Sequence, residues 1–320
     1  MKKGIVSIGE ALIDFIPLDE TNTAYYKSPG GAPANVAVGL ARLGATSTFL
    51  GKVGKDVLGT FLKDVLEEYG VNTEYLYLTE EARTGAVFVT LAANGERSFD
   101  FYIDPSADRF LSEEEVSEEL ISSNKMIHFG SISMISEPAR SATMKAVELA
   151  KKHQVMVSYD PNLRLGLWPN PEEAKETILS MFSQVDLIKI SEEELEFLTG
   201  QTDIDAGVNV LSSYNIPILL VTVGSEGSYI FKDGEKVKVE AMKVNAVDTT
   251  GAGDAFVSGV LYQFNQYDGN PLSLPAEEIG KFAAFGSVSG GLAASTKGAM
   301  TALPTLAEVQ KISKSQGLTT

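Results

Sequence analysis

Asp248-Thr249-Thr250-Gly251-Ala252-Gly253-Asp254-Ala255-Phe256 lies between a strand-like run at Glu235–Ala241 and an apolar helical pattern. The small residues at 251–253 would let a ligand approach the backbone closely, and N–H groups in the first turn of a helix suit an anion. Asp254 in that turn has a chemical use if a neutral hydroxyl must lose a proton while it attacks a phosphoryl group. The alternative is a glycine-rich loop in which Asp254 only favours the start of a helix.

Short apolar runs alternate with helical patterns along most of the chain. The runs predicted to be buried strands are Ile5–Ile8, Thr48–Leu50, Met126–Phe129, Met156–Tyr159, Asp186–Ile190 and Ile218–Val223. Apolar residues repeat every four positions over 57–66 and predict a helix there. Capping-box patterns predict two further helix starts, at Ser112 with Glu115 and at Ser191 with Glu194. The alternation predicts an α/β fold with a mostly parallel central sheet flanked by helices.

One segment breaks this alternation. Ala86–Ala93 and Glu96–Ile103 are strand-like runs separated by Asn94-Gly95, the pair that a two-residue hairpin turn prefers. Together with Phe15–Leu18 and Tyr25-Tyr26, the hairpin could form a small second sheet that covers one end of the fold as a lid. An antiparallel extension at the edge of the main sheet is the alternative.

Length and composition limit the classes of protein that remain. The chain has 320 residues and no long linker, and we expect one domain over 1–320 with a lid made of insertions at about 12–30 and 84–105. The formal net charge of −17 disfavours binding to nucleic acid or to an anionic membrane. The absence of Cys excludes disulfides and thiolate chemistry, and without a run of 18 apolar residues we expect a cytoplasmic protein.

A second cluster of small residues, Gly30–Ala37, leads into a helical pattern. Its two glycines permit close backbone approach, and the amide of Asn35 can both donate to and accept from a sugar hydroxyl. A plain helix entrance is the alternative. Asp14 lies in an apolar frame and needs a partner, either a pair of polyol hydroxyls or a buried backbone donor.

Val221–Gly227 is a third, weaker cluster, a strand followed by two glycines. The chain contains no Gly-x-x-x-x-Gly-Lys-Ser/Thr motif and no Gly-x-Gly-x-x-Gly after the first strand, which excludes a P-loop protein and argues against a dinucleotide-binding dehydrogenase.

Taken together, these motifs resemble those of the ribokinase-like carbohydrate kinases, the PfkB family, from Ile5 to about Leu303. Gly30–Ala37 looks like the family's sugar-site motif, and Asp248–Asp254 is similar to its C-terminal signature. Ser158–Arg164 resembles the fructokinase branch. The resemblance implies a ribokinase-like fold with a small β-sheet lid, a sugar substrate, ATP with Mg²⁺, a monovalent cation such as K⁺, and a homodimer formed through the lid.

The resemblance also implies roles for individual residues. Asp254 would be the general base, and the anion hole would consist of Gly251, Ala252 and Gly253. The implied sugar contacts are Asp14, Gly30, Gly31, Asn35, Tyr102 and Arg164. The implied nucleotide contacts are Lys189, Glu194, Thr222, Gly224, Gly227 and Ser287. The implied ligands of the monovalent cation are Asp248 and Thr250.

We expect phosphorylation of fructose to fructose 6-phosphate, with three alternatives open. A 2-keto-3-deoxygluconate kinase must bind a carboxylate; relatives use an Arg after a lid Tyr, whereas here Tyr102 is followed by Ile103-Asp104. Arg97, Arg109 or Arg164 could compensate for that acid. An aminoimidazole riboside kinase or another nucleoside kinase could use the same glycines for a ribose. A non-catalytic regulatory relative would have no need of a base at the anion hole.

Overall fold

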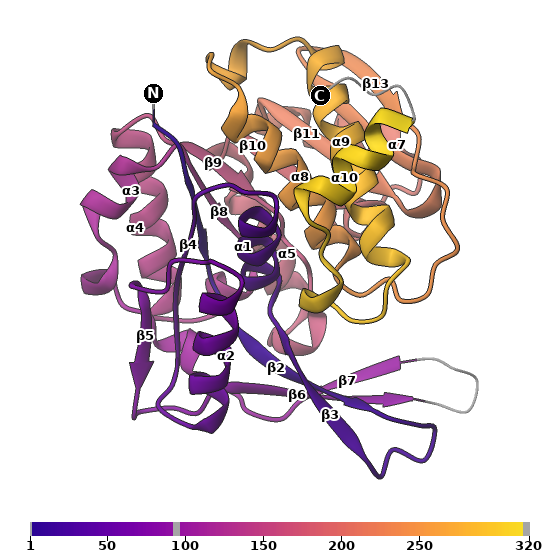
Figure 1. Cartoon of the computed structure of the whole chain (residues 1–320). Coiled ribbons are helices and arrows are strands. Elements are labelled where there is room, and N and C mark those ends of the chain that lie inside the picture. The colour runs from indigo at the N-terminus through magenta and orange to yellow at the C-terminus, as the bar shows by residue number, and fades with distance from the viewer. Residues whose placement is uncertain (1, 92–96, 316–320) are drawn as a thin grey trace.

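The computed structural model describes residues 2–91 and 97–315, and Figure 1 shows a large helix-covered sheet with a smaller sheet at one end. Within these residues, the main sheet has nine strands in the order β13-β12-β11-β10-β9-β8-β1-β4-β5. Their bounds are β1 Ile5–Ile8, β4 Ser47–Gly54, β5 Leu76–Thr79, β8 Met126–Phe129, β9 Met156–Tyr159, β10 Leu187–Ser191, β11 Ile218–Val223, β12 Gly227–Lys232 and β13 Glu235–Val239.

The predicted strands are confirmed, and they lie side by side in this sheet. β1, β8, β9 and β11 match the predicted runs residue for residue, whereas β4 is longer and β10 begins one residue later. All pairs from β11 to β5 are parallel, and β12 and β13 add an antiparallel edge. The confirmed runs are buried on both faces of the sheet, which is why they are continuously apolar.

Helices cover both faces of the main sheet (Figure 1). Their bounds are α1 Ala32–Arg42, α2 Val57–Glu68, α3 Glu118–Ser123, α4 Ala139–Lys152, α5 Pro171–Ser180, α6 Glu192–Thr199, α7 Ile204–Leu211, α8 Ala252–Gln266, α9 Ala276–Ala294 and α10 Leu306–Ser315. One core packs α4, α5 and α6 against the sheet, and another packs α1, α8 and α9 against its opposite face. No helix among the described residues is long and apolar enough to cross a membrane.

Of the two predicted capping boxes, one begins a full helix. Ser191 and Glu194 cap α6 with reciprocal side-chain to backbone hydrogen bonds. Ser112 and Glu115 form the same box, but it closes only a three-residue 3₁₀ turn at Glu113–Glu115, so the helix predicted there is wrong. Val116 is extended after that turn, and α3 begins at Glu118 with Ser117 as its own cap.

The small sheet contains four strands of the described chain in the order β3-β2-β6-β7. Their bounds are β2 Leu12–Pro17, β3 Tyr25–Gly30, β6 Gly85–Leu91 and β7 Arg97–Phe101. The lid sheet is thus confirmed as a separate layer, and the alternative of an extended main-sheet edge is wrong. The predicted Asn94-Gly95 turn lies outside the described residues.

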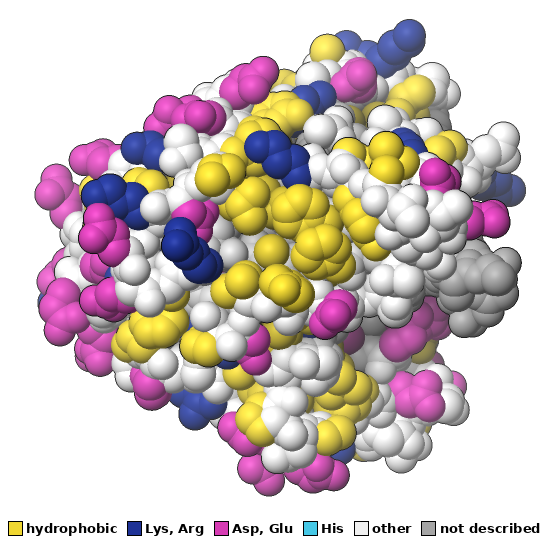
Figure 2. Space-filling model, turned by 90° about the horizontal axis from the view of Figure 1, so that it is seen from below, with side chains coloured by type: hydrophobic (Ala, Val, Ile, Leu, Met, Phe, Trp, Pro, Cys, Tyr) yellow, Lys and Arg dark blue, Asp and Glu magenta, His cyan; other side chains and the backbone are white. Residues whose placement is uncertain are grey.

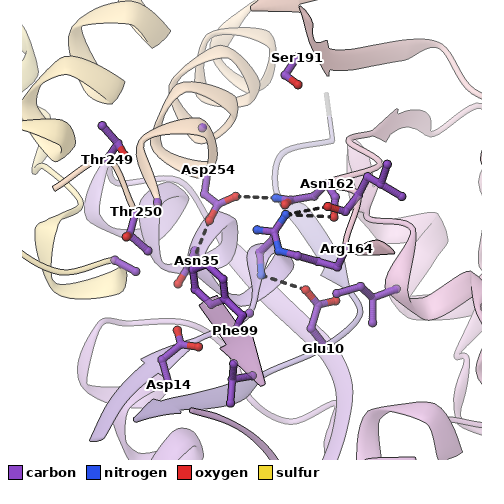
Figure 3. Close-up of a pocket in the computed structure, with 18 of the residues that line it drawn as sticks. Glu10, Asp14, Asn35, Phe99, Asn162, Arg164, Ser191, Thr249, Thr250 and Asp254 are labelled. Atoms are coloured by element: carbon purple, nitrogen blue, oxygen red, sulfur yellow. Dashed lines mark hydrogen bonds between the residues drawn. The ribbon is translucent and has the colours of Figure 1, made fainter. Parts of the chain in front are cut away.

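The two faces of this lid sheet differ. Asp14 and Phe99 lie on its inner face, toward the main body (Figure 3). On the outer face, the rings of Phe15 and Phe88 stack with centroids 4.9 Å apart, and Tyr102 meets Phe88 edge-on. Figure 2, seen from below, shows hydrophobic side chains gathered over this outer face.

Candidate active site

A cavity of about 980 Å³ lies between the lid sheet and the carboxyl ends of the parallel strands. Parallel α/β sheets present their ligand sites at this edge. The residues that line the cavity include Glu10 after β1, Asn162, Leu163 and Arg164 after β9, Lys189 and Ser191 on β10, Asn35 on α1, Asp248–Gly251 before α8 and Asp254 in its first turn. The lid contributes Leu12, Asp14, Val87, Phe99 and Phe101.

Asp254 occupies the first turn of α8 and is held by two amides. The Asn35 amide donates from Nδ2 to Oδ2 of Asp254 at 2.8 Å, and the Asn162 amide donates from Nδ2 to Oδ1 at 3.2 Å (Figure 3). The side chain is only 7% exposed. Burial raises the pKa of Asp254 to about 6, and the hydrogen bond from Asn35 opposes that rise. A carboxylate with this pKa is a proton acceptor near neutral pH.

The helix start beside Asp254 can receive an anion. Gly251 caps α8 in the left-handed region at φ 76°, and a Cβ there would lie 3.1 Å from the backbone of Ala299. The first N–H groups of a helix have no partner within the helix and point out of its end. Gly253 lies beside the ammonium of Lys189, whose Nζ is 3.7 Å from the position that a Cβ on Gly253 would take. The N–H of Ala252 donates to the carbonyl of Thr249 at 3.2 Å, and Ala252 does not line the cavity. The turn therefore offers backbone donors at Gly251 and Gly253 together with a cation.

Lys189 is fixed by a buried ion pair. Its Nζ lies 3.1 Å from Oδ2 of Asp160, and the two residues are 9% and 4% exposed. Burial alone would lower the pKa of Lys189, but the carboxylates of Asp160 and Glu194 outweigh it and raise the pKa. The side chain therefore stays cationic beside the first turn of α8.

On the lid side, Asp14 faces the cavity from β2. Burial raises its pKa to about 6, opposed by Arg164 and reinforced by Asp254. A Cβ at Gly30 would lie 2.5 Å from Oδ2 of Asp14, so a side chain there would displace this carboxylate from its present position. Gly31 begins α1 at φ 102°, in the region that favours glycine.

The remaining two predicted sugar contacts differ in position. Arg164 lines the cavity and is exposed, and its guanidinium donates to the carbonyl of Leu163 at 3.1 Å. Tyr102 does not line the cavity. It is 70% exposed and packs against Phe88 on the outer face of the lid, so the geometry does not support Tyr102 as a sugar contact.

Of the predicted nucleotide contacts, Lys189 and Glu194 line the cavity and the other four do not. Glu194 accepts the backbone N–H groups of Ser191 and Leu163, each at 2.8 Å, and burial raises its pKa against the opposing charge of Lys189. Thr222 pairs with Ser191 in the sheet, and Gly224 follows directly after β11. These residues therefore continue the same strand-end edge beyond the cavity.

Gly227 and Ser287 are engaged with other parts of the chain. Gly227 has φ 110°, and a Cβ there would lie 2.0 Å from the carbonyl oxygen of Val239. The Ser287 hydroxyl accepts the N–H of Met242 at 2.9 Å and donates to the carbonyl of Glu240 at 3.3 Å. Ser287 therefore holds the segment that follows β13, and Gly227 lets the end of β13 approach closely.

Asp248 and Thr250 form an oxygen-rich turn before α8. Oδ1 of Asp248 accepts the backbone N–H of Thr250 at 3.0 Å and its hydroxyl at 2.7 Å, and Oδ2 accepts the N–H of Gly298. Asp248 is only 6% exposed. A buried carboxylate beside a hydroxyl supplies the hard oxygen atoms that an alkali cation prefers, so these residues fit such an ion chemically.

Sequence reasoning assigned no role to Asn162, Asp160 or Glu10, all of which the structure brings to the cavity or its wall. The N–H of Ala32 donates to Oε1 of Glu10 at 3.0 Å, which ties the end of β1 to the start of α1. These residues could have been found from their position in the sequence, because polar residues that directly follow parallel strands meet at the ligand-binding edge of the sheet.

Comparisons with known proteins agree with this geometry. The family model described as "pfkB family carbohydrate kinase" matches residues 2–306. "Probable fructokinase-2" of Arabidopsis thaliana is 44% identical over 318 residues, which cover 98% of this chain and 96% of that protein. "Probable fructokinase-6, chloroplastic" of the same plant is 46% identical over 310 residues, 94% of this chain and 80% of that protein.

Two solved structures share the fold over nearly the whole chain. The fructokinase of Xylella fastidiosa with bound ATP has a TM-score of 0.92 and 35% identity, covering 99% of this chain and 100% of that one. A fructokinase double mutant of Vibrio cholerae O395, bound to fructose, ADP and potassium ion, has a TM-score of 0.86 and 37% identity, covering 97% and 99%. The chain belongs to the pfkB family of carbohydrate kinases.

Proposed function

We propose that this protein is a fructokinase that transfers the γ-phosphoryl group of ATP to fructose, giving fructose 6-phosphate and ADP. The observation that carries the proposal is Asp254, a buried carboxylate with a pKa of about 6 in the anion-binding turn of α8. The sugar hydroxyl oxygen forms the new bond to phosphorus, the bond from phosphorus to the ADP oxygen breaks, and the hydroxyl proton passes to Asp254. The fructokinase relatives support the choice of sugar.

In this proposal the N–H groups of Gly251 and Gly253 and the Lys189 ammonium stabilise the transferring phosphoryl group. The N–H of Ala252 donates to the carbonyl of Thr249 at 3.2 Å and would join them only by leaving that partner. Oxyanion-type donors of this kind are each worth about 3 kcal/mol of barrier. Asp14, Asn35 and Arg164 would hold the sugar hydroxyls, with Gly30 and Gly31 making room for them.

The wall of the cavity favours a neutral sugar over a sugar acid. The lid side presents Asp14, Phe99 and Phe101, an acid and two apolar rings. Arg109 is buried outside the cavity, where it contacts Asp104 at 3.7 Å and donates to Ser136 at 3.1 Å. The side chain of Arg97 lies outside the described part of the chain. A carboxylate-bearing substrate would therefore rely on Arg164 against the repulsion of Asp14.

ATP would lie along the strand-end edge formed by Thr222, Gly224 and Gly227, with Ser287 acting indirectly through the segment after β13. Among residues 2–91 and 97–315, no group of three His, Cys, Asp or Glu side chains could hold a metal ion. Mg²⁺ would accordingly be held by the ATP phosphates and by water, where it neutralises charge on the phosphoryl oxygens. A monovalent cation such as K⁺ would bind at Asp248 and Thr250; a relative solved with a potassium ion bound supports the presence of such an ion, and the oxygen atoms of this turn support its place.

The proposal includes a homodimer formed through the outer face of the lid. Phe15, Phe88 and Tyr25 form a ring cluster there, Tyr102 exposes most of its surface beside it, and Figure 2 shows the patch. Sedimentation should show a dimer for the wild type and a monomer for Tyr102→Lys; a monomeric wild type would contradict this part. The cytoplasmic location stays a prediction, because one relative is called chloroplastic.

The experiment that tests the function is an ADP-release assay with ATP and Mg²⁺ over four acceptors. We expect the highest kcat/KM for fructose, and much lower values for ribose, 2-keto-3-deoxygluconate and aminoimidazole riboside. A preference for aminoimidazole riboside would favour the nucleoside-kinase alternative. ADP release with none of the four would support a non-sugar substrate, and no ATP binding at all would support the regulatory alternative.

A further inference from the structure

The two oxygens of Asp254 are held by amides from different parts of the chain. Asn35 reaches Oδ2 from the first turn of α1, and Asn162 reaches Oδ1 from the loop after β9 (Figure 3). An ionised carboxylate oxygen can accept two hydrogen bonds, so each oxygen keeps a lone pair for a substrate. Only the NH₂ end of an amide side chain can donate to a carboxylate, so both contacts favour the ionised form of Asp254.

Asn162 is itself held firmly in place. Its backbone has φ 47°, the left-handed region that Asn tolerates better than most residues. The carbonyl of Pro161 accepts the N–H of Ser131 at 2.9 Å, and the N–H of Leu163 donates to Glu194 at 2.8 Å. Both neighbours of Asn162 are therefore anchored, which fixes the direction of its amide.

We propose that Asn162 is a positioning residue for the base: together with Asn35 it clamps the carboxylate of Asp254 in one orientation and keeps it ready to accept the hydroxyl proton. This inference rests on the proposed phosphoryl transfer. A residue that only shapes its own loop would leave the carboxylate's proton affinity unchanged, whereas a clamp sets that affinity.

Other charged groups also act on Asp254, and the test must leave them in place. Asp160 after β9 raises the pKa of Asp254, whereas Lys189 on β10 and Arg164 after β9 lower it. Asp254 in turn raises the pKa of Asp14 on β2. Because a substitution at Asn162 leaves these charges unchanged, a change in the pKa of Asp254 can be attributed to the loss of the amide.

Two substitutions at Asn162 test the clamp. Asn162→Gly keeps the left-handed backbone available but removes the donor, and Asn162→Asp keeps the size of the side chain but replaces the donor with a like charge. The matched control is Asn215→Gly, because Asn215 has φ 51° and lies exposed, away from the cavity.

The first readout is the pH dependence of kcat/KM for fructose. Loss of one hydrogen bond to a charged group should move the acid limb up by roughly one pH unit in Asn162→Gly, so activity falls about twofold at pH 7 and about tenfold near pH 5, and it recovers above pH 8. Asn162→Asp should move the limb further. An equal loss at every pH with the limb unmoved would overturn the proposal, and Asn215→Gly should match the wild type.

The second readout needs no turnover. The carboxyl carbon of Asp254 can be titrated by NMR in ¹³C-Asp-labelled protein without substrate, with Asp254→Asn assigning the signal. Its midpoint should rise in Asn162→Gly and stay unchanged in Asn215→Gly. A shifted midpoint in a protein that does not phosphorylate fructose would refute the proposed function and leave the clamp standing. An unshifted midpoint in an active fructokinase would refute the clamp alone.

Discussion

The proposed sugar side of this site consists mainly of side chains, whereas the proposed nucleotide side consists mainly of backbone. On the sugar side, Asp14, Asn35 and Asp254 are side chains that face one cavity and constrain one another by hydrogen bonds or charge. On the proposed nucleotide side, Gly224 and Gly227 present backbone near a strand end, outside the cavity. The comparison predicts that side-chain substitutions should change the sugar side most, and that changes of backbone shape should matter most on the nucleotide side.

The largest effect should come from the base. Asp254→Asn keeps the shape and much of the hydrogen bonding but cannot accept the proton, so kcat should fall by roughly 10²- to 10⁴-fold. Sugar and ATP affinities should change far less, because the N–H groups of the helix start survive the substitution. Steady-state kinetics with calorimetry for both ligands measure this.

The control for this change is Asp205→Asn, another acid in the first turn of a helix, at the start of α7 and outside the cavity. It should leave kcat unchanged. Near wild-type turnover by Asp254→Asn would mean that Asp254 only stabilises the helix start, and the proposed mechanism would fail even in a sugar kinase.

The next effect should be confined to the sugar side. Asp14→Ala removes a carboxylate that can bond to sugar hydroxyls, and such charged hydrogen bonds are worth about 1.5–3 kcal/mol, so the fructose KM should rise roughly 10- to 100-fold. ATP affinity measured by calorimetry should hardly change. Equal loss of both ligands would contradict the division between the two sides.

The strands of the main sheet could be predicted from the sequence, because they are buried on both faces and form continuous apolar runs. Asp254 and Asn35 could also be singled out from the sequence as candidate site residues, since each lies in a glycine-rich stretch that leads into a helix. The contact of Asn162 with Asp254 could not be predicted in this way, because it joins residues 92 positions apart and needs a left-handed backbone at Asn162. Local patterns report helix starts and strands, whereas contacts between distant loops depend on how the strands are ordered in the sheet.

The same limit explains why the helix predicted at Ser112 is wrong. Ser112 and Glu115 form a true capping box, yet nothing in the box itself says how many turns follow it. The sugar contact assigned to Tyr102 by resemblance stays a prediction: Tyr102 follows β7, lies against Phe88 on the outer face of the lid and does not line the cavity.

The pH dependence should come from the sugar side. Burial raises the pKa of Asp254 and of Asp14 to about 6, so both carboxylates are ionised above that value and become protonated below it. A protonated base cannot accept the hydroxyl proton, and kcat/KM for fructose should fall by at least about tenfold from pH 7 to pH 5. In Asp14→Asn the acid limb should become less steep. A flat profile down to pH 5 would contradict the assignment of Asp254 as the base.

The smallest effect should come from the nucleotide side. Gly224 has φ 42°, and a Cβ there would meet nothing within 4 Å, so Gly224→Ala fits sterically and costs only about 1–2 kcal/mol of backbone strain. The added methyl would lie on the surface where ATP is proposed to bind, and the ATP KM should rise a few-fold while the fructose KM stays constant.

Gly70→Ala is the matched control, because Gly70 also has a left-handed backbone, at φ 83°, and a Cβ there would meet nothing within 4 Å. Gly70 follows α2 and lies away from the cavity. Both variants should lose a similar amount of stability in thermal melts, and only Gly224→Ala should weaken the binding of ATP. An unchanged ATP KM in Gly224→Ala would move the nucleotide away from the β11 strand end and leave the sugar side as the only part of the site correctly assigned.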